Sequence, residues 1–470
     1  MKIRIILYFF SFLFLSALSL AQTTQQLTPE QEKWISKANR HEKNGWLYLH
    51  IEGNPEERGF QYGFLLANEI KESIRVLSVS WEYQTALKWS WFVQKAGEIL
   101  SKKVDPENLK EINGIVKGMK AANISTSLDE LVALNGYVEL TDYWFPAVKD
   151  SLKINAPETV KQSCSSFIAT GNMTSDGGIV LGHNTHTVYF CPPCNLIMDI
   201  VPEKGHHILM QALVGFIHSG TDFFVTDAGL VGSETTISGF FPFDENGVPE
   251  FSRMRTATQY ASSIDEWCKI MEKDNNGAYA NSWLLGDVNT NEIARLELGL
   301  KYVGFEKKKD GFFTGSNVPE DLRILRFETK SHETDIRFSS VARRVRWNTL
   351  MKEYAGMINI ELAEKFEADH FDTYLNKELP DCRTMCQHCD LDAELSGPYL
   401  PFTPDGALDG KVLDSKMAKQ MSFVARWGSS CGKAFDAKKF LQEHPQFNWM
   451  AGILKSRPSQ PWTIFHAGEK

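Results

Sequence analysis

The spacing of hydrophobic residues changes at about residue 164 of the chain. Before that point apolar residues recur three and four positions apart, which is the period of an amphipathic helix. The clearest example is the set Leu109, Ile112, Val116 and Met119. Similar spacing predicts helices over 56–70 and 81–101. The first third of the chain is therefore expected to be mostly helical.

Three shorter stretches complete this first part. Residues 23–43 are polar and Gln-rich, so we expect a mobile lead-in. The run 46–51 crowds apolar and aromatic residues together and predicts a strand. Residues 153–162 have no strong pattern and include Pro157, which is typical of an exposed linker.

After residue 164 the pattern becomes one of short β-prone runs joined by Gly, Asn and Asp turns. Strands are predicted at 164–170, 179–183, 196–201, 208–214, 223–226, 230–237, 282–287, 293–298 and 302–306. Helices are predicted at 257–273 and 339–353. Strands flanked by helices indicate an α+β fold in which two stacked sheets lie between helical layers.

Composition and charge narrow the classes of function. The chain has 470 residues, of which 43% are hydrophobic and 12% aromatic, and its net charge is −9. Its basic residues are scattered apart from Lys307-Lys308-Lys309, which lies between two predicted strands. A nucleic-acid partner is therefore not expected.

The N-terminus predicts export. Residues 1–21 combine a basic start, a long apolar run and a small-residue end, which is the pattern of a secretory signal peptide. No later apolar run reaches the length of a membrane span, so no transmembrane anchor is expected in the mature chain. The expected location is periplasmic, secreted or lumenal. Eight cysteines in an exported chain also predict disulfides, with pairing left open.

Candidate chemistry begins at Cys164. This residue opens a predicted hairpin, Cys164–Ala169 followed by Gly177–His186. A cut just before Cys164 would place a thiol and a free α-amine on one residue, and that amine, with a pKa near ~8, is able to activate its own nucleophile. The alternative is a small buried residue that merely begins a strand.

A larger set of motifs resembles one known class of enzymes. Cys164-Ser165-Ser166-Phe167 with Gly182-His183-Asn184-Thr185 is similar to the nucleophile hairpin of N-terminal nucleophile (Ntn) hydrolases. The nearest branches are the phospholipase B-like and the isopenicillin-N acyltransferase-like families. Motifs that follow in the same order are 219–224, 229–237, 280–283, 314–319, 339–346, Asp369-His370 and Cys386-Gln387-His388. The resemblance covers roughly residues 45 to 435.

The resemblance implies a four-layer αββα sandwich and a processed chain. Residues 22–163 would form a mostly helical prosegment, or α chain, and residues 164–470 the catalytic β chain. The two would stay associated after self-cleavage.

The resemblance also implies roles for individual residues. Asn281 and Asn317 would donate hydrogen bonds to the oxyanion, and Arg343 would hold the nucleophile or polarise the site. Glu234, with Thr235 beside it, would lie near the new amine. For each of these residues the alternative is an ordinary structural role, such as a turn residue or a salt-bridge partner.

The segment His183-Asn184-Thr185-His186 departs from the more distant relatives. Choloylglycine hydrolases and ceramidase-like amidases carry Arg-Asn-x-Asp there, whereas the phospholipase B-like branch keeps His-Asn-Thr. We expect His183, Asn184 and His186 to bind substrate or support the site, with both histidines facing the same side of the strand. The histidine pair has no clear third ligand, so no metal is expected at it, and no metal or cofactor is expected elsewhere in the chain.

Two cysteine groups admit more than one interpretation. One group could form a zinc site, and its members are Cys382, Cys386, Cys389, His388 and Cys431. Their spacing is irregular for a zinc finger, however, and export favours disulfides over zinc binding. Cys191-Pro192-Pro193-Cys194 resembles a redox motif but lacks a βαβ context, so disulfide bonding is the expected role.

These observations favour an exported Ntn cysteine hydrolase that cleaves itself before Cys164. Its substrate would be small or lipid-like, and it would hydrolyse a linear amide bond of an N-acylated amine, amino acid or small peptide through a thioester. Two alternatives remain: a phospholipase B-like lipid ester hydrolase, and an inactive binding relative that keeps the fold.

Overall fold

The computed structural model describes residues 26–154, 164–394 and 400–469. The predicted signal peptide and the residues immediately before Cys164 lie outside these ranges. Within them, none of the helices has both the length and the apolar character that a membrane crossing requires.

A nine-stranded sheet runs through the centre of the molecule. Its strand order is β1-β2-β6-β7-β8-β9-β10-β11-β12, and every neighbouring pair is antiparallel except β2 and β6. The bounds are β1 Asn39–Lys43, β2 Trp46–Gly53, β6 Leu196–Pro202, β7 Ile208–Ala212, β8 Phe223–Thr226, β9 Leu230–Thr236, β10 Asn281–Asp287, β11 Glu292–Leu298 and β12 Val303–Lys308. The parallel pair joins the part of the chain before Cys164 to the part after it.

A six-stranded antiparallel sheet carries the predicted nucleophile hairpin. Its order is β13-β3-β4-β17-β18-β19. The bounds are β13 Gly311–Gly315, β3 Ser165–Thr170, β4 Val180–Asn184, β17 Asp409–Asp414, β18 Ser422–Trp427 and β19 Thr463–His466. Two small ribbons pair β5 (His186–Val188) with β16 (Asp405–Ala407) and β14 (Phe371–Asp372) with β15 (Lys377–Glu378).

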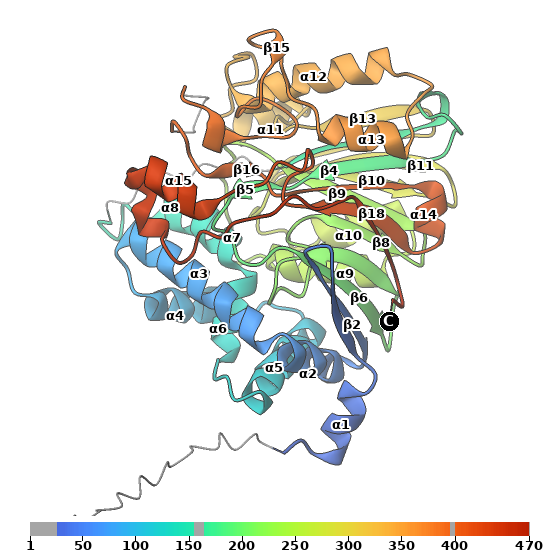
Figure 1. Cartoon of the computed structure of the whole chain (residues 1–470). Helices are drawn as coiled ribbons and strands as arrows, with labels where there is room; N and C mark the ends of the chain where they lie inside the picture. The colour runs from blue at the N-terminus through green and yellow to red at the C-terminus, as the bar shows by residue number, and fades with distance from the viewer. Residues whose placement is uncertain (1–25, 155–163, 395–399, 470) are drawn as a thin grey trace, which may run out of the picture.

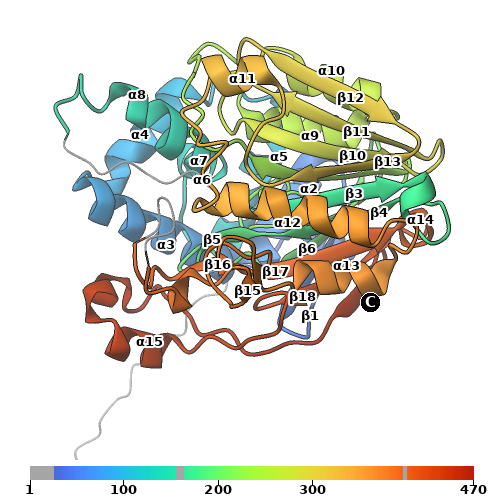
Figure 2. The same ribbon diagram turned by 90° about the horizontal axis from the view of Figure 1, so that it is seen from above.

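Helices cover the outer face of each sheet, as Figures 1 and 2 show. Those before Cys164 are α1 Pro29–Ile35, α2 Pro55–Leu65, α3 Ala67–Thr85, α4 Trp89–Ile99, α5 Pro106–Ala121, α6 Leu128–Asn135, α7 Tyr137–Glu139 and α8 Phe145–Val148. Those after it are α9 Glu250–Tyr260, α10 Ile264–Glu272, α11 Leu322–Phe327, α12 Ser339–Glu353, α13 Ile360–Glu367, α14 Ser415–Lys419 and α15 Ala437–Glu443.

Three hydrophobic cores separate the layers. One lies between the sheets and includes Tyr48 of β2, Ile168 of β3 and Phe423 of β18. The second lies between the nine-stranded sheet and the helices α2 to α6, α9 and α10. The third lies between the six-stranded sheet and α12 and α13. The predicted αββα sandwich with a mostly helical N-terminal part is confirmed.

Several predicted boundaries are wrong for local reasons. The segment expected to be a mobile lead-in contains α1 and β1, and α1 begins with a capping box in which Thr28 and Gln31 bond to each other's backbone. The helix predicted over 81–101 is broken because Ala86 adopts a left-handed conformation, with φ of +59°. The helix predicted over 257–273 is two helices, since α9 ends at Tyr260 and Ser263 caps α10.

Candidate active site

Cys164 lies directly before β3, at the edge of the space between the sheets. Its side chain is buried and only 2% exposed. Its backbone has a φ of +74°, a left-handed value that few side chains other than glycine adopt readily. This conformation lets the chain enter β3 while the Cys164 carbonyl turns toward α12.

Arg343 of α12 contacts that carbonyl. Its Nη1 donates to the Cys164 carbonyl oxygen at 2.8 Å, and its Nη2 donates to Oδ1 of Asn317 at 2.6 Å. Its Nε donates to Oγ of Ser339, one helical turn earlier, at 3.1 Å. The guanidinium is fully buried, and it joins the predicted nucleophile to one predicted oxyanion donor.

Two carboxylates lie beside the Cys164 thiol. The sulfur and one oxygen each of Asp222 and Glu234 are within 4.8 Å of one another, and all three residues are buried. The Tyr279 hydroxyl donates to Asp222 Oδ2 at 2.6 Å and lies 3.1 Å from Glu234 Oε1. Glu234 was predicted to lie here, whereas Asp222 and Tyr279 were not predicted as site residues, although Asp222 belongs to the motif 219–224. Both missed residues have positive φ in connecting segments, and no periodic pattern marks such positions.

This environment disfavours negative charge. Burial, followed by the charges of Glu234 and Asp222, raises the pKa of the Cys164 thiol well above its usual range. Burial also raises the pKa of Asp222 to about 6. The pKa of Glu234 is raised well above its usual range, first by burial and then by the charge of Asp222. Three acidic groups in one buried space therefore favour an added positive charge.

The two predicted oxyanion donors differ in their surroundings. Asn281, the first residue of β10, is fully buried, and neither its Nδ2 nor its Oδ1 has a hydrogen-bond partner in the described ranges. Asn317 donates from Nδ2 to the Thr236 carbonyl at 2.8 Å and accepts from Arg343 through Oδ1. The Asn281 amide is thus the better placed to bind an added oxygen.

The two histidines of the His-Asn-Thr-His segment face different ways. Nε2 of His183 lies 3.1 Å from the Glu234 carbonyl in the opposite sheet, whereas Nε2 of His186 lies 2.8 Å from the Met385 carbonyl. Nδ2 of Asn184 also donates to the Met385 carbonyl, at 2.9 Å. The expectation that both histidines share one side is wrong, because β4 ends at Asn184 and His186 begins another strand.

Both histidines are held neutral. Burial, and then the nearby positive charges of Lys411 for His183 and of Arg343 for His186, lowers each pKa well below the usual range. Their second nitrogens, Nδ1 in each case, are buried without a partner among the described residues.

Two further polar residues line the same region. Thr235 is fully buried on β9, and its hydroxyl has no partner in the part of the chain that the structure describes. Lys411 of β17 is also fully buried, and its Nζ donates to Asp409 at 2.8 Å and to the Thr185 hydroxyl at 2.6 Å. Lys411 was not predicted from the sequence.

The eight cysteines are free thiols in the structure. Six lie in neighbouring pairs, namely Cys191 with Cys194, Cys382 with Cys389, and Cys386 with Cys431. The sulfurs of the first pair are 2.8 Å apart. Cys164 and Cys268, which is buried on α10, stand apart from these pairs. Disulfide bonding remains a prediction.

Comparison with known proteins places the chain in a family. The family model described as phospholipase B matches residues 38–303. Phospholipase B-like protein C of Dictyostelium discoideum is 25% identical over an alignment of 408 positions, and the match covers 74% of this chain and 66% of that protein. Phospholipase B of Crotalus adamanteus is 25% identical over an alignment of 259 positions, and the match covers 50% of this chain and 44% of that protein. The matched region thus spans less than two thirds of each relative.

A solved structure aligns with part of the chain. It is a mutant of conjugated bile acid hydrolase from Clostridium perfringens, which aligns with 56% of this chain and 89% of its own length at 12% identity and a TM-score of 0.33. The match to the family model covers more than half of the sequence. This chain belongs to the phospholipase B family.

Proposed function

We propose that the chain is an exported N-terminal nucleophile hydrolase that cleaves itself before Cys164 and then hydrolyses amide bonds through a thioester on that residue. The observation that carries the proposal is the position of Cys164. Its carbonyl is held by Arg343, and its buried thiol lies beside Asp222 and Glu234. Covalent hydrolysis of this kind needs a nucleophile, a base and an oxyanion donor on the chain itself.

The first step is cleavage of the Ser163–Cys164 bond. The Cys164 sulfur attacks the Ser163 carbonyl carbon, the C–N bond breaks, and the thiol proton ends on the new α-amine. Water then hydrolyses the thioester, which leaves the Ser163 carboxylate and a free thiol. The hydrogen bond from Arg343 to the Cys164 carbonyl supports this step because it fixes the backbone of Cys164, and intramolecular attack depends on the positions of the reacting atoms.

The new amine changes the electrostatics of the site. As an ammonium it is attracted to Asp222 and Glu234, and it offsets the negative charges that raise the Cys164 pKa. A neighbouring cation lowers a thiol pKa and so increases the thiolate fraction. Cleavage would thus make the Cys164 thiol a stronger nucleophile toward substrate than it is in the uncut chain.

Turnover follows the same chemistry with a substrate. The thiolate attacks the substrate carbonyl carbon, the α-ammonium gives its proton to the leaving amine, and the acyl group remains on sulfur. Water then attacks the thioester with the amine as base, and the acid product leaves. Asn281 is the proposed donor to the tetrahedral oxygen because its buried amide has no other partner among the described residues. Asn317 and Arg343 would keep the nucleophile in place.

Other residues support the site in this proposal. His183, Asn184, His186 and Thr235 would shape the pocket, since the histidines are neutral and bonded to backbone carbonyls. Residues 22–163 and 164–470 would stay together after the cut, because β2 pairs along its length with β6.

Hydrolysis of lipid esters is a second candidate, and the family match favours it. The relatives named above are called phospholipase B and phospholipase B-like proteins. A thiolate attacks an ester carbonyl by the same route as an amide, so the same residues would serve. The substrate then depends on the acyl pocket and not on the nucleophile.

One assay separates the two candidates and tests the mechanism. Mature protein is incubated with N-acyl amino acids and, separately, with phospholipid vesicles, and the acid-quenched chain is weighed by mass spectrometry. We expect an acyl adduct on the chain that begins at Cys164 with the amide substrates, and no adduct with Cys164→Ala. An adduct only with phospholipid would select the ester reaction, and turnover by Cys164→Ala would remove both.

A further inference from the structure

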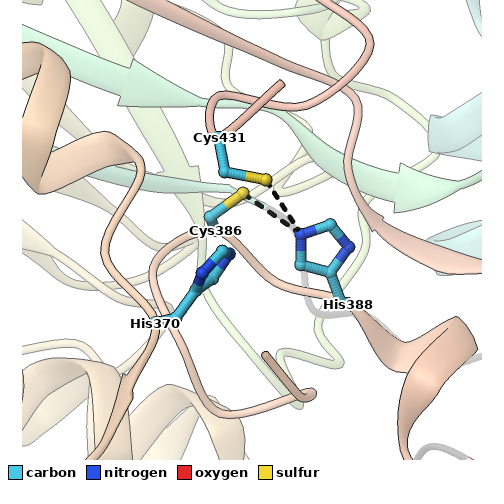
Figure 3. Close-up of side chains that lie close together, drawn as sticks. All are labelled: His370, Cys386, His388 and Cys431. Atoms are coloured by element: carbon cyan, nitrogen blue, oxygen red, sulfur yellow. Dashed lines mark hydrogen bonds between the residues drawn. The ribbon is translucent and has the colours of Figure 1, made fainter. Parts of the chain in front are cut away.

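Four side chains with metal-binding atoms meet away from Cys164. They are His370, after α13, Cys386 and His388, in the loop that follows β15, and Cys431, after β18 (Figure 3). One ligand atom from each lies within 4.8 Å of all the others. Cys386 and His388 are buried, and the other two are partly buried.

Hydrogen bonds among these four side chains do not explain why they lie so close together. Nε2 of His388 lies 3.4 Å from the Cys386 sulfur and 3.3 Å from the Cys431 sulfur. One ring nitrogen carries either one proton or one lone pair, so it cannot serve two thiols at once. Nε2 of His370 is buried without a partner among the described residues. A cation between the four atoms would satisfy all of them together.

We propose that His370, Cys386, His388 and Cys431 bind one zinc ion. Two cysteines and two histidines are a common tetrahedral donor set for Zn²⁺, and four protein ligands leave no open position, as in structural sites. At ~2.3 Å from sulfur and ~2.0 Å from nitrogen, tetrahedral zinc holds a sulfur and a nitrogen about 3.5 Å apart. The two separations between His388 Nε2 and the sulfurs are close to that value. Two thiolates also cancel the charge of the ion.

The surroundings of the four ligands suit a metal. Asp390 lies behind His388, with Oδ1 3.7 Å from Nδ1, on the ring side opposite the sulfurs. A carboxylate behind a ligating histidine orients the ring and makes it a better ligand. The backbone N–H of Lys433 donates to the Cys431 sulfur at 3.4 Å, which stabilises a thiolate.

A zinc ion here would link three segments of the chain, which carry His370, Cys386 with His388, and Cys431. The loop that carries Cys386 and His388 also carries Met385, whose carbonyl accepts from Asn184 and His186. The Cys386 N–H donates to the Asp369 carbonyl at 3.0 Å, so His370 is already next to this loop. Zinc would therefore position the main-chain acceptors behind β4 and β5. Any effect on turnover rests on the proposed function, whereas metal binding does not.

The site differs from the zinc alternative drawn from the sequence. Cys382 and Cys389 pair with each other and lie outside the four-ligand cluster, while His370 takes part. A Cys386–Cys431 disulfide is the competing arrangement for an exported chain. In that arrangement the ring nitrogens of His370 and His388 would face the two disulfide sulfurs, which are poor hydrogen-bond partners.

Metal analysis of the full-length mature protein tests the proposal. Protein purified without chelator is expected to contain about one zinc per chain, the stoichiometry of one four-ligand site. Replacement of zinc by Co²⁺ is expected to give visible bands of tetrahedral cobalt and near-ultraviolet thiolate-to-cobalt absorption. Both signals should fall to background in Cys386→Ser, Cys431→Ser and His370→Asn. They should persist in Cys268→Ser, which removes a buried thiol elsewhere.

Two results would overturn the proposal. One is a wild-type chain that binds neither Zn²⁺ nor Co²⁺ after reduction of all thiols, a measurement that does not depend on a variant folding. The other is a peptide map in which Cys386 and Cys431 are disulfide-linked in metal-free protein purified without reductant. If zinc binds and the chain has no hydrolase activity, the proposed function fails while the zinc site stands.

Discussion

Two clusters of side chains, one around Cys164 and one around Cys386 and Cys431, differ in the charge of the groups beside their cysteines. Cys164 lies beside the carboxyl groups of Asp222 and Glu234. Cys386 and Cys431 lie beside the imidazoles of His370 and His388. Carboxylates raise a thiol pKa, whereas imidazoles are ligands that share a metal ion with a thiolate.

This difference in charge suits the Cys164 cluster to catalysis and the second cluster to structural metal binding. The Asn281 amide, which is the proposed oxyanion donor of the first cluster, has no partner among the described residues and so keeps its hydrogen-bonding capacity for a ligand. The second cluster offers four ligands to one ion and leaves no open position. In this account a positive charge completes both clusters. Cleavage creates that charge as an α-ammonium in the first, and zinc supplies it in the second.

Removal of the Cys164 thiol should have the largest effect. Cys164→Ala is expected to stop both cleavage and turnover, because alanine keeps the fold but has no nucleophile. Wild-type protein should separate into chains of about 16 and 35 kDa, from the mean residue mass. Cys164→Ser should mature slowly and remain far less active, since a hydroxyl is scarcely ionised near neutral pH.

Denaturing gels and an amidase assay on the same samples measure this effect. Cys268→Ser is the matched control, since it alters another buried thiol and should leave both readouts unchanged. If Cys164→Ala still yields two chains, self-cleavage at this bond is wrong.

Removal of the Asn281 amide should come next in size. Asn281→Ala is expected to lower kcat by ~10²–10³-fold, the usual cost of losing one oxyanion donor. The free energy of unfolding should change little, because this amide makes no hydrogen bond within the described residues. Asn317→Ala should instead destabilise the fold, since it loses its contacts with Arg343 and Thr236. Normal kcat in Asn281→Ala would remove Asn281 from the site.

The carboxyl pair predicts a pH-dependent stability in the uncut chain. Burial raises the pKa of Asp222 from 3.8 to about 6 in the folded state, so its contribution is fully present below pH 3.8 and is lost as pH rises through about 6. The test uses the Cys164→Ala chain, in which the bond stays intact, with and without Asp222→Asn. As pH rises over that range, the free energy of unfolding of the chain with Asp222→Asn should gain on the order of 3 kcal/mol relative to the chain that keeps Asp222. Urea unfolding at a series of pH values measures the difference. Parallel curves for the two proteins would contradict the assignment.

The smallest predicted effect concerns the residue behind the zinc ligand. Asp390→Asn should weaken zinc binding by ~10–100-fold, which is typical for loss of a group that orients a ligating histidine. Competition with a chromogenic chelator measures the affinity. Tyr189→Phe is the control, because it removes the hydroxyl that donates to Asp390 at 2.9 Å but keeps the carboxylate. An equal loss in both variants would assign the effect to packing.

The sequence predicted the layers and most central strands because those strands are buried on both faces. Every residue of β3 and β4 is buried, so their apolar runs stand out from the surrounding turns. β17 was harder to find, because Lys411 interrupts its pattern. That buried charge is compensated by Asp409 on the same strand and by the Thr185 hydroxyl. The helix break at Ala86 depends on a single left-handed residue, which no hydrophobic period reveals.

The candidate active site was predicted only in part, because some of its residues belong to sequence motifs and others do not. Cys164, Arg343 and Asn317 belong to sequence motifs, and the structure brings them together. Asp222 and Tyr279 come from separate connecting segments and meet only through the fold. Cys386, His388 and Cys431 belong to the zinc alternative drawn from the sequence, whereas no spacing joined His370 to them.

The most direct test of the central claim is the N-terminal sequence of the chains in active, purified wild-type protein. The account predicts two termini, one of which begins Cys164-Ser165-Ser166-Phe167 with an unblocked α-amine. Full activity in a preparation that contains only chains uncut at the Ser163–Cys164 bond would contradict it, because the proposed base would not exist.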